Sequence, residues 1–186
     1  MAASRLTEPT RIVDGTDGAR CHLGGKYLTF KLAGEEFGLA ILKVREINGL
    51  IDITALPRMP AYMKGVINLR GKVVPVIDLR LKFGLPEAQY AEQTCIILVN
   101  VGHEVGLIVD TVSEVLDIPG EQIDPHPALN GAVDTSFILG MGKVGTDVKI
   151  LLDVDKILNT QELSVVSAVL TPTAGLRNEG NAALSS

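Results

Sequence analysis

Residues 34–47 read GEEFGLAILKVREI, and residues 102–115 read GHEVGLIVDTVSEV. A shift of 68 positions, from 34 to 102, places identical residues opposite one another. The matching positions are Gly34, Glu36, Gly38, Leu39, Val44 and Glu46 with Gly102, Glu104, Gly106, Leu107, Val112 and Glu114. Identities that share one spacing over so short a stretch indicate that the chain contains an internal duplication.

A second block repeats farther along the chain, at a shift of 75 positions, from 65 to 140. The pairs are Gly65 with Gly140, Val73 with Val148, and Asp78 with Asp153. A loop of different length between the two blocks explains the change of shift. Short strands that end at Gly and Pro favour two small β-barrels over a parallel α/β sheet.

Apolar runs separated by turn residues predict strands in both halves. In the first half these are residues 27–32 and 37–41, followed by a hairpin of 66–69 and 73–77 around Arg70-Gly71. In the second half they are residues 96–101, 105–109, 137–144 and 148–154. Pro75 cannot donate to a sheet ladder, so we expect it at a sheet edge or a bulge.

Two segments have helical character. Residues 78–84 predict one or two helical turns that stop at Gly84. Residues 161–170 predict a C-terminal helix, because Leu163, Val166 and Leu170 recur at spacings of three and four.

Composition limits the class of protein. The 186 residues are 46% hydrophobic and 21% charged, which predicts a folded globule, and the formal net charge of −5 disfavours nucleic acid as a partner. Cys21 and Cys95 do not form a secreted disulfide framework, so we expect reduced thiols and a cytoplasmic protein. Neither a signal peptide nor an apolar run long enough to span a membrane is apparent, which predicts no direct membrane insertion.

Residues for catalysis or metal binding are not gathered in any recognisable pattern. His22, His103 and His126 lack metal-ligand spacing, so we expect no metal and no cofactor. The stretch 140–146, GMGKVGT, departs from a phosphate loop because Phe137 and Val144 replace the required Gly and Ser or Thr. We predict a protein that is not an enzyme, with a nucleotide-binding enzyme centred on Lys143 as a remote alternative.

Several blocks resemble one known family. Residues 63–80, MKGVINLRGKVVPVIDLR, look like the signature of the chemotaxis coupling proteins of the CheW family. Residues 35–47 and 111–116 resemble an earlier and a later block of that family, and the likeness covers roughly 26–158. The resemblance implies a mainly β fold of two intertwined SH3-like five-stranded barrels, with short helices and a C-terminal helix.

The same resemblance sets the expected domain bounds. We expect a flexible leader at 1–24 and a CheW-like domain at 25–160, then the C-terminal helix with a disordered tail at 161–186. Within the domain the first barrel is placed at roughly 26–90 and the second at roughly 93–158, and exchange of strands between them stays open.

The family likeness implies an adaptor that binds two partners. One is the regulatory domain of a CheA-type histidine kinase, and the other is the cytoplasmic tip of methyl-accepting chemoreceptors, whose arrays would recruit the protein to the membrane. Receptor contact is implied for Arg70, Val44 and Val112, and kinase contact for Ile41, Glu46, Asp124 and Leu129. A structural role within the signature is implied for Gly65, Asn68, Gly71, Pro75 and Asp78.

One region departs from the family pattern. Asp124 and Leu129 stand where a basic and an aromatic residue are expected, so this kinase contact is either weaker or matched to a changed partner. A related alternative is a coupling protein of a chemosensory pathway that controls pili or gene expression, and the sequence does not separate the two.

Overall fold

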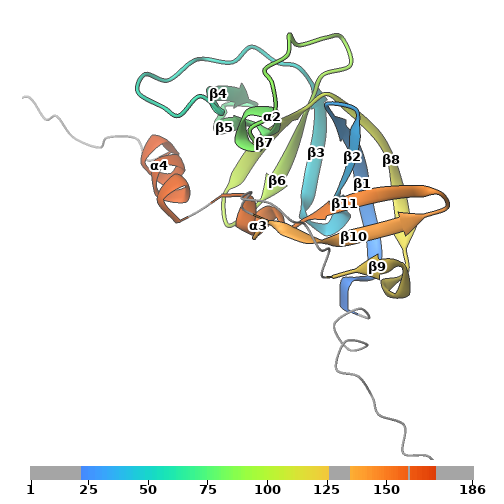
Figure 1. The fold of residues 1–186 in the computed structure, drawn as a ribbon. Helices are drawn as coiled ribbons and strands as arrows, with labels where there is room; N and C mark the ends of the chain where they lie inside the picture. The colour runs from blue at the N-terminus through green and yellow to red at the C-terminus, as the bar shows by residue number, and fades with distance from the viewer. Residues whose placement is uncertain (1–21, 126–134, 159, 171–186) are drawn as a thin grey trace, which may run out of the picture.

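Two β-sheets and a few short helices make up the protein (Figure 1). The computed structural model describes residues 22–125, 135–158 and 160–170. The predicted mainly β class is therefore confirmed. Leader residues 1–21, with Cys21, and tail residues 171–186 lie outside the described residues, as do Leu129 and His126.

The first sheet has six strands in the order β8-β1-β2-β11-β10-β9. Their bounds are β1 Gly25–Leu32, β2 Glu35–Ala40, β8 Thr111–Ile118, β9 Ile123–Asp124, β10 Ile138–Val144 and β11 Asp147–Leu152. All neighbours are antiparallel except β2 and β11. β9 has only two residues, so the sheet has five strands of ordinary length.

The second sheet has five strands in the order β3-β6-β7-β5-β4. Their bounds are β3 Val44–Gly49, β4 Met63–Leu69, β5 Lys72–Asp78, β6 Cys95–Asn100 and β7 Glu104–Val109. Only β5 and β7 are parallel. The two sheets therefore share one plan, as the duplication predicts.

The two copies of the repeat exchange their first two strands. β1 and β2 belong to the first copy but pair with β8 and β11 of the second, and the blue and orange strands lie together in Figure 1. In return, β6 and β7 of the second copy pair with β3 and β5 of the first. The ranges 26–90 and 93–158 therefore do not each form one sheet.

Each sheet encloses its own apolar cluster, and a third cluster lies between them. The second sheet packs residues such as Ile67, Val74 and Ile96, while the first packs Tyr27 and Ile118 with two further aliphatic side chains. The shared cluster draws buried side chains from both sheets. Burial of aliphatic surface stabilises such folds by about 25 cal/mol per Å², so the shared cluster joins the barrels into one unit.

Matching backbone details confirm the duplication at the atomic level. The Asp78 amide donates to the Tyr62 carbonyl over 2.7 Å, and the Asp153 amide donates to the Phe137 carbonyl over the same distance. The register of β4 against β5 shifts just before Gly65, as does that of β10 against β11 before Gly140.

Pro75 is not at an edge, so that expectation was wrong. β5 lies between β7 and β4, and the register shift on its β4 side is near Gly65 rather than at the proline. Pro75 pairs with Val66 of β4, whereas the parallel pairing with β7 begins one residue later, at Val76. The proline fits an interior strand because it precedes that second ladder.

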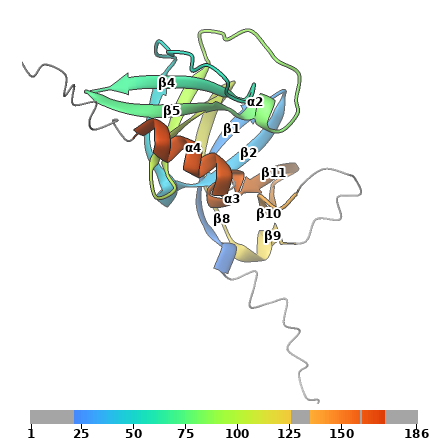
Figure 2. The same cartoon turned by 90° about the vertical axis from the view of Figure 1, so that its left-hand side faces the viewer.

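Apart from α4, which follows α3, the helices are single turns at strand ends. They are η1 Ile41–Lys43, α2 Leu79–Lys82, η2 Gly120–Gln122, α3 Val154–Ile157 and α4 Thr160–Leu170. The side chains of Asp78 and Asp153 cap α2 and α3 by accepting hydrogen bonds from the backbone amides of Leu81 and Asp155. The predicted C-terminal helix is present as α4, which lies outside the sheets beside β5 in both views (Figures 1 and 2).

Candidate interaction surfaces

Arg70 and Glu46 form an ion pair between the two edge strands of the second sheet. Arg70 lies at the tip of the β4–β5 hairpin, and its Nη2 donates to Glu46 Oε1 on β3 over 2.6 Å. The Arg70 side chain is still 74% exposed. A residue predicted to contact the receptor and one predicted to contact the kinase therefore lie within one hydrogen bond of each other.

The hairpin tip holds Arg70 in an uncommon backbone conformation. Arg70 and Gly71 have φ of 52° and 84°, which suits a two-residue hairpin turn. The Asn68 Oδ1 accepts the Gly71 amide over 2.9 Å and braces the turn. A non-glycine residue rarely adopts positive φ, so the geometry presents the guanidinium at some cost in strain.

Ile41, Val44 and Val112 are half-buried rather than freely exposed. All three pack against the shared core cluster. Val44 begins β3 and pairs with Val99, while Val112 lies near the start of β8 and pairs with Phe30. Each therefore offers only part of its side chain to a partner.

Asp124 lies in β9, where it pairs with Met141 of β10. It is half-buried, and its carbonyl lies against Gly140, where an added Cβ would come within 2.6 Å. Leu129, its predicted companion, is among the residues that the structure does not describe.

Leu42 is an exposed apolar residue that sequence reasoning missed. Its side chain is 93% exposed within η1, next to Ile41, and both residues line a pocket of about 370 Å³ with Tyr27. The repeat could have indicated that Leu42 is unusual, because the equivalent position, 68 residues later, is the charged Asp110. An apolar residue where its counterpart is ionic marks a surface that differs between the two copies.

An apolar pocket of about 360 Å³ lies where α2 meets the first sheet. The lining residues are Phe37, Lys82, Phe83, Gly84, Leu85, Phe137, Ile138 and Ile150. The site residues predicted from the sequence do not line it. Its aromatic side chains belong to a stack that runs into the core, so the pocket is continuous with the shared cluster.

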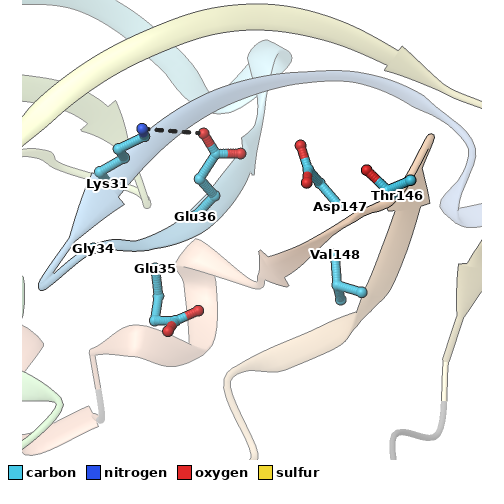
Figure 3. A pocket seen from close by; sticks show the side chains of 7 residues that line it. All are labelled: Lys31, Gly34, Glu35, Glu36, Thr146, Asp147 and Val148. Carbon is cyan, nitrogen blue, oxygen red and sulfur yellow. Dashed lines mark ion pairs between the residues drawn. The ribbon is translucent and has the colours of Figure 1, made fainter.

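A polar pocket of about 430 Å³ lies between the β1–β2 and β10–β11 turns (Figure 3). Lys31 of β1 points toward Glu36 of β2, with 3.7 Å between Nζ and Oε1. The buried Lys149 pairs with Glu36 and lies 3.7 Å from Asp147. Because Lys149 is paired with Glu36, it joins β2 to β11 without the cost of an isolated buried charge.

The glycine-rich stretch around Lys143 forms a hairpin. β10 contains Lys143, which pairs with Val148 of β11 across the turn. A phosphate loop instead precedes a helix whose N-terminus meets the phosphates, so the local structure here does not match the nucleotide-binding alternative. Within residues 22–125, 135–158 and 160–170, no group of three His, Cys, Asp or Glu side chains is placed to hold a metal.

α4 is attached through a buried carboxylate. Glu162 accepts hydrogen bonds from the Tyr62 hydroxyl and from Lys82, whose ammonium lies 4.5 Å from the centre of the Tyr62 ring. Burial, then the hydrogen bond and charge of Glu162, raise the pKa of Tyr62 to about 12. Sequence reasoning missed this cluster because its members are far apart in the chain.

None of the helices in the described part of the chain is long and apolar enough to cross a membrane.

Comparison with known proteins gives one consistent family. The family model described as the CheW-like domain matches residues 26–162. Chemotaxis protein CheW of Klebsiella aerogenes is 42% identical over 148 residues, covering 79% of this chain and 89% of that protein. Protein FrzA of Myxococcus xanthus is 29% identical over 145 residues, covering 76% and 90%.

A solved structure agrees with the sequence relatives. The crystal structure of scaffolding protein TtCheW from Thermoanaerobacter tengcongensis superposes with a TM-score of 0.69 at 35% identity. The match covers 75% of this chain and 96% of that one. Because the family model, the sequence relatives and the solved structure agree, the chain belongs to the CheW-like family of chemotaxis coupling adaptors.

Proposed function

We propose that this chain joins the regulatory domain of a CheA-type histidine kinase to the cytoplasmic tips of methyl-accepting chemoreceptors. It acts in the cytoplasm without catalysis and reaches the membrane arrays only through these partners. The Arg70–Glu46 ion pair is the observation that carries the proposal, because it brings the two predicted contact surfaces together on an exposed sheet edge.

The receptor surface of the proposal consists of Arg70, Val44 and Val112. An exposed guanidinium suits carboxylates and carbonyls at the end of a receptor helix. The half-buried valines contribute apolar contact of the kind that an amphipathic helix makes in a groove.

The kinase surface of the proposal consists of Ile41 and Glu46 on the first copy and of Asp124 with Leu129 on the second. Glu46 and Asp124 are half-buried acidic side chains on β3 and β9, and Glu46 already accepts a hydrogen bond from Arg70, so each offers only part of its side chain to the kinase domain. Leu42, beside Ile41, extends this surface with an exposed aliphatic side chain.

The direct test is binding of the full chain to the purified kinase regulatory domain and to a receptor-tip fragment, measured separately by calorimetry. Arg70→Ala is expected to weaken receptor binding about tenfold or more, and Glu46→Ala to weaken kinase binding similarly. Lys72→Ala is the matched control, because Lys72 lies in the same hairpin and pairs with Glu104 instead. A parent chain that binds neither partner would refute the proposal.

A second candidate is the same coupling role in a chemosensory pathway that controls pili or gene expression. The observation that favours testing it is the relative named FrzA rather than CheW. Deletion of the gene separates the two, since loss of swimming chemotaxis points to the first and loss of surface motility or a changed expression pattern points to the second.

A further inference from the structure

Two ion pairs occupy equivalent places in the two sheets. In the second sheet, Arg80 of α2 binds Asp110, the residue between β7 and β8, through Nε–Oδ1 and Nη2–Oδ2 distances of 2.5 Å. In the first sheet, Lys43 at the end of η1, between β2 and β3, lies 2.6 Å from Asp155 of α3. Each pair therefore joins the helix that follows the last strand of one copy, β5 or β11, to the connection that follows the second strand of the other copy, β7 or β2.

The charges of the two pairs are reversed. Arg80 and Asp155 are equivalent positions of the repeat, at the shift of 75 residues, and they carry opposite charges. The crossover residues are also opposite in charge, because Asp110 is the counterpart of Leu42, whose neighbour is Lys43. A duplication would first give two pairs of the same polarity, so this reversal distinguishes the copies.

The pairing of the parallel strands does not by itself decide whether the copies exchange strands. Gly38 and Leu39 of β2 lie beside Leu151 and Leu152 of β11. The equivalent residues Gly106 and Leu107 of β7 lie beside Val76 and Ile77 of β5. If each copy folded on itself, a glycine and a leucine would again meet two aliphatic residues, so these pairs do not distinguish the two topologies.

We propose that the reversed ion pairs select the exchanged topology over one in which each copy folds on itself. In the self-paired arrangement β2 lies beside β5, so Lys43 meets Arg80, and β7 lies beside β11, so Asp110 meets Asp155. Both contacts bring like charges together, which is electrostatically unfavourable. In the exchanged arrangement both contacts are attractive, so the charges favour the exchanged fold over the self-paired one.

The test reverses one pair in the full-length chain, by combining Lys43→Glu with Asp155→Lys. The exchanged fold of this variant keeps an opposite pair. The self-paired fold gains two attractive contacts, because Arg80 then meets a carboxylate at position 43 and Asp110 meets an ammonium group at position 155. The matched control is Lys64→Glu with Glu87→Lys, because this pair, 2.8 Å apart, lies within one copy and is indifferent to exchange. Refolding is followed by far-ultraviolet circular dichroism, with interrupted refolding to count native molecules.

The reversed variant is expected to gain a refolding phase at least about tenfold slower than the main phase, as molecules leave the self-paired state. Its unfolding rate should stay within about threefold of the parent, since the native pair persists. Slow refolding phases that arise from proline isomerisation should be the same in the variant and its control, so they do not affect the comparison. Refolding phases identical to those of the control would overturn the proposal.

A second variant guards against a simple loss of native stability. Asp155→Asn removes the native pair but leaves Lys43 opposed to Arg80 in the self-paired fold. It should unfold faster without the new slow phase. If it shows the same slow phase as the reversed variant, the phase reports weakened native structure and the proposal fails.

Discussion

The ring of Phe83 lies flat against the ring of Phe137, with centroids 4.7 Å apart and an angle of 7° between the planes. Phe83 follows α2 on the second sheet, whereas Phe137 precedes β10 on the first. The stack continues through Phe37 to Phe30 in the core, so all four phenylalanines of the chain take part. The two sheets are thus joined by aromatic contact as well as by aliphatic packing.

Phe83→Ala is expected to destabilise the protein by about 2 kcal/mol, because it removes a half-buried ring and its stacking. Phe83→Leu should cost about half as much, since it retains apolar volume. Urea unfolding followed by circular dichroism measures both values. Val148→Ala, at an exposed aliphatic position, is the control. An unchanged midpoint for Phe83→Ala would show that the stack does not join the sheets.

Arg70 is predicted to matter for binding far more than for stability. An exposed ion pair contributes roughly 0–1 kcal/mol, so Arg70→Ala and Glu46→Ala should each unfold close to the parent midpoint. Arg70→Gly should be at least as stable as Arg70→Ala, because glycine accepts the positive φ at this turn. Thermal unfolding of the three variants is the measurement, and a large loss for Arg70→Gly would give the side chain a structural role.

Gly65→Ala is expected to cost about 3 kcal/mol or more, because Gly65 has φ of 143° and an added Cβ would lie 2.0 Å from the Thr54 carbonyl oxygen. Rotation of a side chain cannot relieve this contact, because the Thr54 oxygen belongs to the backbone. Gly49→Ala is the matched control, because a Cβ added there would meet nothing within 4 Å. Equal denaturation midpoints for the two variants would contradict this account of Gly65.

Asp110 should make stability depend on acid pH. Burial opposes ionisation, but hydrogen bonds from Arg80 and the Ala33 amide outweigh it and hold the pKa of Asp110 below its ordinary value. The ionised Asp110 therefore adds to the free energy of unfolding. This stabilisation is fully present above the pKa of the unfolded state, about 3.9, and is lost as pH falls through the lower pKa of the folded state. Asp110→Asn should therefore be less stable than the parent at pH 7, and the gap should narrow below about pH 4. A gap independent of pH in urea titrations would reject this linkage.

Glu162→Gln is expected to lower the pKa of Tyr62, because a neutral amide no longer opposes ionisation of the phenol. Carbon-13 signals of the tyrosine rings, followed against pH, give the value directly. Burial raises the pKa of Tyr27, and burial together with Asp78 raises that of Tyr90, so neither depends on Glu162. A parallel change at all three tyrosines would indicate general unfolding rather than the loss of one contact.

The apolar runs and the repeat made most of the strands predictable, but not which copy each strand joins. Gly38 and Gly106 are identical, so local sequence gives either one the same choice of partner. The information on exchange lies in Lys43, Asp110 and the helix residues that they meet, which are distant in the chain. Strands β3 and β8 were not predicted at all, because their half-exposed faces lack a continuous apolar run.

The contacts that the candidate surface residues make within the protein were not predictable from the sequence. The family signature contains Arg70 and the earlier block contains Glu46, yet nothing in their spacing of 24 residues indicates an ion pair. Pro75 was wrongly expected at an edge or a bulge because a proline cannot donate to a second neighbouring strand. Here the pairing of β5 with its second neighbour, β7, begins only at the next residue, Val76. The cluster around Glu162 could not be predicted, because Glu162, Tyr62 and Lys82 come from three segments that are distant in the chain.

Exchange of strands between the copies has a mechanical consequence. A pull applied between the Arg70 hairpin on one sheet and the Asp147 turn on the other would be carried along continuous backbone that crosses both barrels. The two copies therefore cannot separate without breaking the pairing of β1 with β8, β2 with β11, β3 with β6 and β5 with β7.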